Sequence, residues 1–174
     1  SPRYGGPIIG MIRDFITGAY LLTKRGTLLN KIDTCRLLVS IDYDEDLPEP
    51  AVRKPELLWS GRDIFSVLLP KDLNHVAKAN ICLRCDTCKE EDCENDAYVI
   101  VRNGKLVQGA IDRNSIGAEK SESILHRVIK EYGSEAAKIF LNSLCRLVTT
   151  FLVMRGFSYT LDELDISNDS REKI

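Results

Sequence analysis

The spacing of the apolar residues changes along this chain from a helical period to a strand period and back. In the middle, residues 97–102 and 105–108 are rich in valine, isoleucine and tyrosine, and the dipeptide Asn103-Gly104 separates them. Asn-Gly between two such runs is typical of a two-residue β-hairpin turn, because both positions require positive φ. Helical spacing precedes and follows this region, and residues 75–81 are a further strand candidate. The pattern predicts an α+β fold with mixed short helices, a central hairpin in a small antiparallel sheet, and two C-terminal helices.

Three helices are expected before the hairpin. The first begins at Asp14, which can cap the helix or favour its positive end, and Gly26 stops it. The second covers residues 31–40 with Asn30 as its N-cap, and the third begins after Ser60 and ends by Pro70. The expected buried positions are Phe15, Ile16, Ala19, Tyr20 and Leu22 in the first helix, and Ile32, Cys35, Leu38 and Val39 in the second.

Two helices are expected after the hairpin. Ile124, Leu125, Val128, Ile129 and Tyr132 form one amphipathic stripe that Gly133 stops. Ser134 can cap a longer helix whose buried stripe is Phe140, Leu144, Val148 and Phe151, with Gly156 beyond its end. Between the second and third helices, residues 42–55 mix acidic residues with prolines, which predicts an extended and solvated loop.

Composition narrows the classes of function. The 24 basic and 26 acidic residues give a formal charge of −2, so no overall field draws the chain to nucleic acid, and any such contact must be local. No uncharged apolar run approaches the roughly 18 to 20 residues that a membrane span needs. The chain opens on Ser1 without a signal-peptide pattern, and we expect a processed chain or a fragment of a longer, cytoplasmic protein.

Four of the six cysteines are crowded into one polar segment, at Cys82, Cys85, Cys88 and Cys93. Four converging thiolates suit tetrahedral zinc, at about 2.3 Å, or an iron-sulfur cluster, and the spacing does not decide between the two. The alternative is a surface loop with free thiols, or thiols that form disulfides in air. A closed four-thiolate site has no open position for chemistry, so its role would be structural. His75 could replace one cysteine, whereas Cys35 and Cys145 fall on apolar stripes and are expected to be core residues.

The groups that catalysis needs are not found together. His126 falls on the polar side of its helix and His75 lies near a strand start, so both are expected to be structural or solvated. The chain has no phosphate-binding loop, no HExxH motif and no GxSxG motif. The acids between residues 42 and 49 are typical of a solvated face. The sequence therefore does not predict a self-sufficient active site.

Several segments resemble the largest subunit of multisubunit RNA polymerases. They are SPRYGGPIIGMIRD at residues 1–14, GAYLLTKR at 18–25, KPELLWSGRDIF at 54–65, NGKL at 103–106, residues 109–117, and the paired helices at 131–158. The amino-acid sequence of the first segment is similar to that of the archaeal A-prime form. The chain departs from the family at Ser60, Arg62 and Asp63, where Thr, Lys and Gln are usual, and in the cysteine insertion.

The resemblance implies a position within that enzyme. The aspartate-rich motif that holds the catalytic magnesium lies upstream in the family and is absent here, so magnesium is expected only in the complete enzyme and outside this chain. The resemblance implies a segment after the active centre at residues 1–26, a pore domain at 27–157 with the insertion at 82–93, and the start of the funnel region at 158–174. The pore region bounds the secondary channel, through which nucleotides enter and into which backtracked RNA moves.

Arg13, Lys24 and Arg25 are the basic residues of the best-matching segment and are the candidates to face the channel. Lys24 and Arg25 also sit where cations favour a helix C-terminus. The implied partners are other polymerase subunits, the DNA template, RNA, nucleoside triphosphates and a transcript-cleavage factor, with no membrane. Alone, the chain is expected to be inactive. The alternative is a metal-stabilised protein-interaction module without enzymatic activity, and a third, weaker alternative is a stand-alone enzyme.

Overall fold

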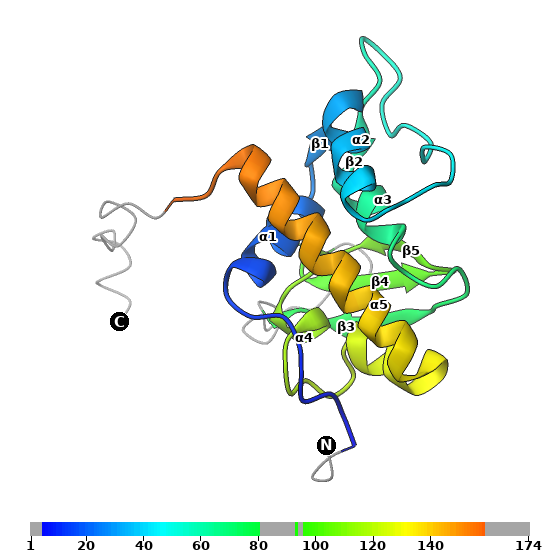
Figure 1. The fold of residues 1–174 in the computed structure, drawn as a ribbon, viewed down its shortest axis with the longest axis vertical. Coiled ribbons are helices and arrows are strands. Elements are labelled where there is room, and N and C mark those ends of the chain that lie inside the picture. The colour runs from blue at the N-terminus through cyan, green and yellow to red at the C-terminus, as the bar shows by residue number, and fades with distance from the viewer. Residues whose placement is uncertain (1–4, 81–92, 94–95, 159–174) are drawn as a thin grey trace.

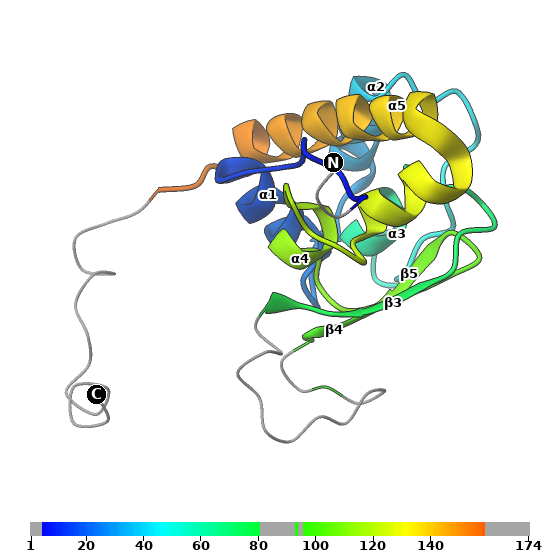
Figure 2. The same cartoon turned by 90° about the horizontal axis from the view of Figure 1, so that it is seen from below.

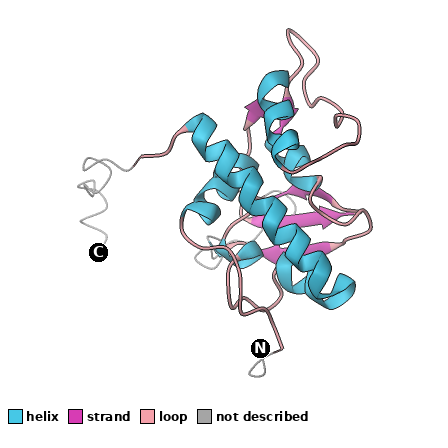
Figure 3. Cartoon of the chain, viewed as in Figure 1, coloured by secondary structure: helices cyan, strands magenta, loops and turns pink. Residues whose placement is uncertain are grey.

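The computed structural model describes residues 5–80, 93 and 96–158, which form a helical layer packed on a small antiparallel sheet (Figures 1 and 2). The mixture of helices and antiparallel strands confirms the predicted α+β class (Figure 3). The elements, in chain order, are α1 Asp14–Thr23, β1 Leu28–Leu29, α2 Lys31–Ser40, β2 Trp59–Ser60, α3 Gly61–Ser66, β3 His75–Lys78, β4 Tyr98–Arg102, β5 Lys105–Gln108, α4 Arg113–Ile116 and α5 Ile124–Arg155.

The central sheet has the antiparallel order β3-β4-β5, and the predicted hairpin joins its last two strands. Arg102 pairs with Lys105 across the turn, and Asn103 and Gly104 both have positive φ, at 47° and 72°. These values are those of a type I′ turn, whose twist matches that of the strands. The hairpin prediction is confirmed. A second small pair, β1 with β2, was not predicted, because two-residue strands carry no periodic signal.

The long C-terminal element α5 consists of two helical arms. Gly133 lies between them with φ 86° and ψ 178°, which is not helical, so the predicted stop at this glycine is confirmed. Ser123 caps the first arm by accepting a hydrogen bond from the backbone N–H of His126 at 3.0 Å. By length and composition α5 could cross a membrane, but its apolar face packs within both hydrophobic clusters of the core. The protein fold therefore accounts for its hydropathy.

The core comprises two clusters that α5 spans. The larger lies between the sheet and α5, where the rings of Phe65 and Phe140 meet edge to face at 6.5 Å. The smaller joins α1, α2 and Trp59 to the C-terminal part of α5. Gly18 lets α1 approach α5 closely, because a Cβ at this position would lie 2.4 Å from Val148. A side chain at residue 18 would force the two helices apart.

The predicted buried stripe of α2 is wrong except at Leu38. Thr34, Leu37 and Leu38 face the core, whereas Ile32 and Val39 are 65% and 72% exposed and Cys35 is half-exposed. The helix carries two apolar stripes, and the side that packs is the one facing α5 and Trp59. Tyr20 of α1, also expected in the core, is exposed. Periodicity identified the helices here but not which side of each is covered.

A buried ion pair between Arg62 and Asp96 connects segments from four parts of the chain. The side chains of Arg62 and Asp96 are 16% and 10% exposed. Asp96 also accepts hydrogen bonds from the backbone N–H groups of Arg25, at 3.1 Å, and Gly109, at 3.2 Å. The Arg62 Nε donates to the carbonyl oxygen of Thr23 at 2.9 Å. The pair thus holds α3, the end of α1 and the residues that flank β4 and β5 in one arrangement.

Thr23 extends this network into the core. Its hydroxyl donates to the carbonyl oxygen of Ala19 at 2.7 Å and accepts from the backbone N–H of Ile111 at 2.8 Å. Thr23 is fully buried. Because every contact joins residues that are far apart in sequence or lie at a helix end, the network fixes the tertiary arrangement rather than any single element.

We expect Asp96→Ala to lower the free energy of unfolding by about 3–5 kcal/mol, because it leaves the buried Arg62 charge without its counter-charge and two backbone N–H groups without their acceptor. Equilibrium urea unfolding would measure the loss. Arg146→Ala provides the control: it removes the exposed Arg146–Asp42 pair, whose side chains are 59% and 80% exposed, and should cost less than about 1 kcal/mol. Equal losses in the two variants would contradict the role assigned to the buried pair.

Candidate functional site

The three predicted channel-facing cations lie at opposite ends of α1. Arg13 immediately precedes the helix, whereas Lys24 and Arg25 follow its last residue. A helix of 10 residues is about 15 Å long, so the charges of Arg13 and Lys24 do not meet at one point. The three cations can therefore line a passage as separate charges, but they cannot all bind one small anion.

Arg13 is exposed and has a left-handed backbone, with φ 48°. Its carbonyl oxygen accepts hydrogen bonds from the N–H groups of Ile16 and Thr17, which starts the helix without a side-chain cap. Asp14 is in the first turn and makes no cap hydrogen bond, so it acts there through its charge. The Arg13 side chain forms no ion pair with any residue that the structure describes.

Lys24 and Arg25 are held by their backbones and leave their side chains at the surface. Lys24 ends α1, and its N–H donates to the carbonyl oxygen of Tyr20 at 2.8 Å. Its side chain lines a hollow of about 460 Å³ that also contains Arg155 and Met154. Arg25 is exposed, while its N–H is tied to Asp96. Lys24 therefore shares its hollow with a second cation from α5.

Two of the three residues that depart from the family pattern, Ser60 and Arg62, make contacts within the fold. Ser60 caps α3 by accepting a hydrogen bond from the N–H of Arg62 at 3.2 Å. Arg62 makes the buried ion pair with Asp96. Burial raises the pKa of Asp63, although the charges of Lys105 and Arg62 oppose this change. The chemistry of this segment stabilises the fold and offers no paired acid and base.

Only the last of the four predicted metal ligands lies within the described residues. Cys93 is half-buried, and its sulfur accepts a hydrogen bond from the N–H of Ala97 at 3.4 Å. Cys82, Cys85 and Cys88 lie outside the described residues. Within the described part of the chain, no group of three metal-ligating side chains comes together. The metal site stays a prediction.

The strand register separates His75 from Cys93. His75 pairs with Val101 at one end of β3, and Lys78 pairs with Tyr98 at the other end, which is the end nearer Cys93 in the chain. At about 3.3 Å per residue, the two ends of this strand are roughly 10 Å apart. His75 therefore lies at the end of β3 that is farther along the strand from Cys93.

The two remaining cysteines differ from each other. Cys145 packs beside Met11, with the sulfur atoms 3.8 Å apart, and burial raises the pKa of its thiol. Cys35 instead lines an apolar groove of about 730 Å³ between α2 and the C-terminal end of α5, together with Ile32, Val39, Thr150, Val153 and Met154. Val153 is 80% exposed. The core assignment fits Cys145 better than Cys35.

A second hollow, of about 560 Å³, lies where the sheet meets the first arm of α5. Its lining includes His75, Arg102, Glu122, His126, Arg127 and Lys130. His75 is buried, and burial together with the charge of Arg127 lowers its pKa to about 4. The Nδ1 atom of His126 accepts a hydrogen bond from the N–H of Glu122 at 3.2 Å. The hollow thus combines two histidines with three cations.

Sequence reasoning did not bring these residues together. His75, Arg102 and Lys130 come from β3, β4 and α5, and each is unremarkable in its own segment. The one available signal was the hairpin, because pairing β3 against β4 necessarily places Arg102 near the start of β3. Predicting this hollow also requires knowing that α5 packs against this edge of the sheet.

Comparison with known proteins gives the family. The family model described as "RNA polymerase Rpb1, domain 3" matches residues 1–164. The chain is 45% identical over its whole length to the DNA-directed RNA polymerase subunit Rpo1N of Methanococcus vannielii, of which it covers 19%. It is also 45% identical to Rpo1N of Methanocaldococcus jannaschii, covering 13% of that protein. The DNA-directed RNA polymerase III subunit RPC1 of Homo sapiens is 36% identical over 94% of the chain.

The chain spans a fifth or less of these relatives, and the match includes the hairpin and both arms of α5. The family match and the identities over the full chain agree with the segments that carried the resemblance. This protein belongs to the RNA polymerase Rpb1 domain 3 family and is similar to part of the archaeal largest-subunit component Rpo1N.

Proposed function

We propose that the chain is the pore region of an archaeal-type RNA polymerase largest subunit, forming part of the wall of the secondary channel. The observation that carries this proposal is the family match over residues 1–164, together with 45% identity to Rpo1N over the whole chain. In the assembled enzyme, nucleoside triphosphates and backtracked RNA would pass this wall. The partners would be the other subunits, template DNA and a transcript-cleavage factor.

The described part of the chain suits a wall better than a catalyst. It has a double core and a buried ion-pair network, which make a stiff support. Its exposed cations at the ends of α1 can attract phosphates locally although the chain has a net negative charge. The catalytic magnesium would be bound by residues outside this chain, and the isolated chain would not synthesise RNA.

The upstream coding sequence tests this assignment directly. An aspartate-rich motif encoded shortly before Ser1 is expected, because that motif holds the catalytic magnesium in the family. Its absence would reject the polymerase assignment, including the division into residues 1–26, a pore domain at 27–157 and the start of the funnel at 158–174.

We expect Arg13→Ala and Lys24→Ala, each made in the assembled enzyme, to raise the KM for nucleoside triphosphates or slow the cleavage of backtracked RNA by about two- to fivefold. The modest size follows from the exposure of Arg13 and the partial exposure of Lys24, since charge contacts at the surface contribute less than about 1 kcal/mol. Steady-state elongation and transcript-cleavage assays would measure the two effects. Arg53→Ala removes an exposed charge from the acidic loop and serves as the control.

Unchanged kinetics of both variants in both assays would assign Lys24 to the helix terminus alone and would remove Arg13 from the channel. An effect of the same size in Arg53→Ala would indicate a general effect of charge. Either result would contradict the role proposed for the ends of α1.

The cysteine insertion is proposed to hold one structural zinc ion, with an iron-sulfur cluster as the alternative. Cys93 fits such a site, because its sulfur accepts a hydrogen bond from the N–H of Ala97, the kind of outer contact that orients a metal ligand. Cys93 also precedes Asp96 by only three residues. A metal bound at the insertion would therefore brace the segment that carries the buried ion pair.

We expect about one zinc ion per chain in protein purified without chelators, and loss of both metal and thermal stability in Cys85→Ser. Elemental analysis and thermal unfolding would measure the two quantities. Cys145→Ser is the matched control, because Cys145 packs beside Met11 and is not one of the four predicted ligands, and this variant should retain the metal. Protein containing neither zinc nor iron would reject the site.

The apolar groove between α2 and α5 favours a second candidate function, a protein-interaction module without enzymatic activity. Ile32, Val39 and Val153 leave large apolar areas exposed, which is typical of protein contacts. Within a polymerase the same groove would meet other parts of the assembly. The upstream coding sequence distinguishes the two functions, because an independent interaction module needs no aspartate-rich motif before it, whereas the polymerase segment does.

A further inference from the structure

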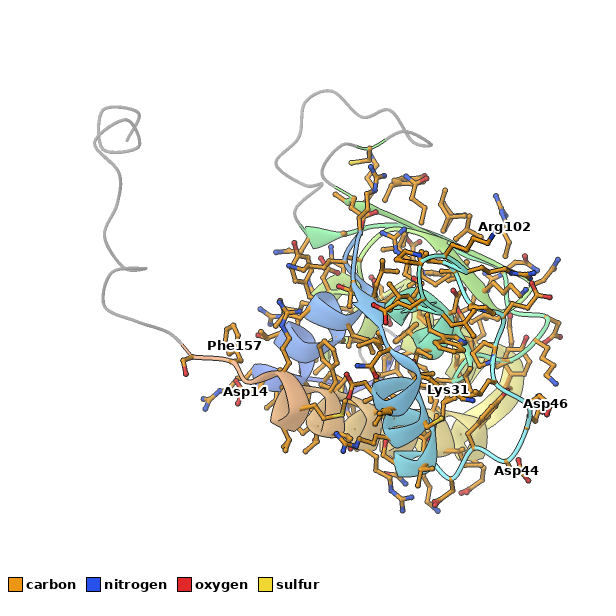
Figure 4. All side chains as sticks on the ribbon, turned by 90° about the horizontal axis from the view of Figure 1, so that it is seen from above. Asp14, Lys31, Asp44, Asp46, Arg102 and Phe157 are labelled. Carbon is orange, nitrogen blue, oxygen red and sulfur yellow. The ribbon has the colours of Figure 1, made fainter. Side chains whose placement is uncertain are left out.

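The hollow between the sheet edge and the first arm of α5 has an excess of positive charge at its rim. Arg102 and Lys130 are exposed and form no ion pair with any other described residue, whereas Arg127 is bound to Glu131 at 2.6 Å. Figure 4 shows Arg102 projecting outward from the sheet. Glu122 is the one acidic residue among those that line the hollow. The local balance is therefore positive, in a chain whose net charge is −2.

His75 forms the buried part of the same hollow and is only 7% exposed. Its Nε2 atom is buried and has no hydrogen-bond partner in the described part of the chain. Buried polar atoms without partners are rare in folded proteins, because each one loses its hydrogen bonds to water. His75 thus lines the same hollow as two unpaired cations and has an imidazole nitrogen that the described part of the chain leaves without a partner.

The positive potential of the rim reaches His75. Burial is the main cause of the lowered pKa of His75, and the Arg127 charge is the second. The imidazole is therefore neutral near pH 7 and can donate one N–H hydrogen bond without adding charge. Neutral imidazole, an arginine and a lysine together match the oxygens of a phosphate group, with the guanidinium able to bind two of them.

We propose that this hollow binds a phosphate group, held by the exposed Arg102 and Lys130 together with the buried His75 that lines the same hollow. The choice of phosphate over carboxylate rests on the proposed function in RNA polymerase, where the surrounding ligands are nucleotides and RNA. The site is separate from the cations of α1, because its residues lie on β3, β4 and α5. The phosphate belongs either to a nucleoside triphosphate or to the backbone of single-stranded RNA.

The test uses the full chain and follows the imidazole NMR signals of His75 and His126 at fixed ionic strength. The probes are inorganic phosphate, ATP without divalent metal, and a short unstructured RNA. Saturable shifts of both imidazoles are expected. Tighter binding of ATP than of RNA identifies a nucleotide site, and the reverse order identifies a backbone site. An absence of saturable shifts with all three probes would overturn the proposal.

The double variant Arg102→Gln with Lys130→Gln should weaken binding about tenfold, because it removes two charge-assisted contacts. Arg53→Gln with Lys138→Gln removes the same two residue types at exposed positions elsewhere, and should change affinity by less than about twofold. Equal weakening in the two double variants would show only a general effect of charge, and would overturn the site.

Two further measurements test the chemical class of the ligand and the role of His75 in binding it. An acidic peptide of the same charge should bind more weakly than RNA, and equal binding would reject phosphate in favour of a protein partner. His75→Gln, with its fold checked by the NMR spectrum, should weaken phosphate binding while Arg102 and Lys130 remain. Unchanged affinity would remove His75 from the site and contradict the proposal. These measurements are independent of the KM and cleavage assays of Arg13 and Lys24. The phosphate site can therefore be rejected while the proposed function stands, and the reverse is also true.

Discussion

The buried pair of Arg62 and Asp96 is the interaction on which the arrangement of this domain most depends. It joins the start of α3 to the residue that leads into β4, and through Thr23 it also fixes the end of α1. Such a pair gains little over apolar packing in free energy, but removing one partner is costly. It therefore specifies which segments meet. The predicted metal insertion ends three residues before Asp96, β4 begins two residues after it, and the backbone N–H of Arg25 is bound to it.

Local chemistry was sufficient to predict the elements whose ends carry specific turn or cap residues. Asn103-Gly104 identified the hairpin, Asn30 and Ser60 identified two helix starts, and Gly133 identified the break in α5. Each of these signals acts within a few residues of the chain. The four-residue helix α4, capped by Asp112, was not predicted, because so short an element has no periodic pattern of its own.

Tertiary choices were not predictable in the same way. The outward side of α2 is as apolar as its buried side, and only the position of α5 decides which is covered. The role of Arg62 was likewise hidden, since its acidic partner is 34 residues away. The hollow around His75 needs three separate elements to form. The segments that carried the resemblance gave the family, whereas side-chain roles depended on contacts between residues distant in the chain.

The groove between α2 and α5 affects how this chain behaves when it is produced alone. Ile32, Val39 and Val153 contribute nothing to either core cluster, so the domain can fold with the groove open to water. A folded domain with an unsatisfied apolar surface lowers its free energy by associating with whatever apolar surface is present. Its apparent melting temperature and its size in solution would then depend on protein concentration, as they do for half of a larger interface.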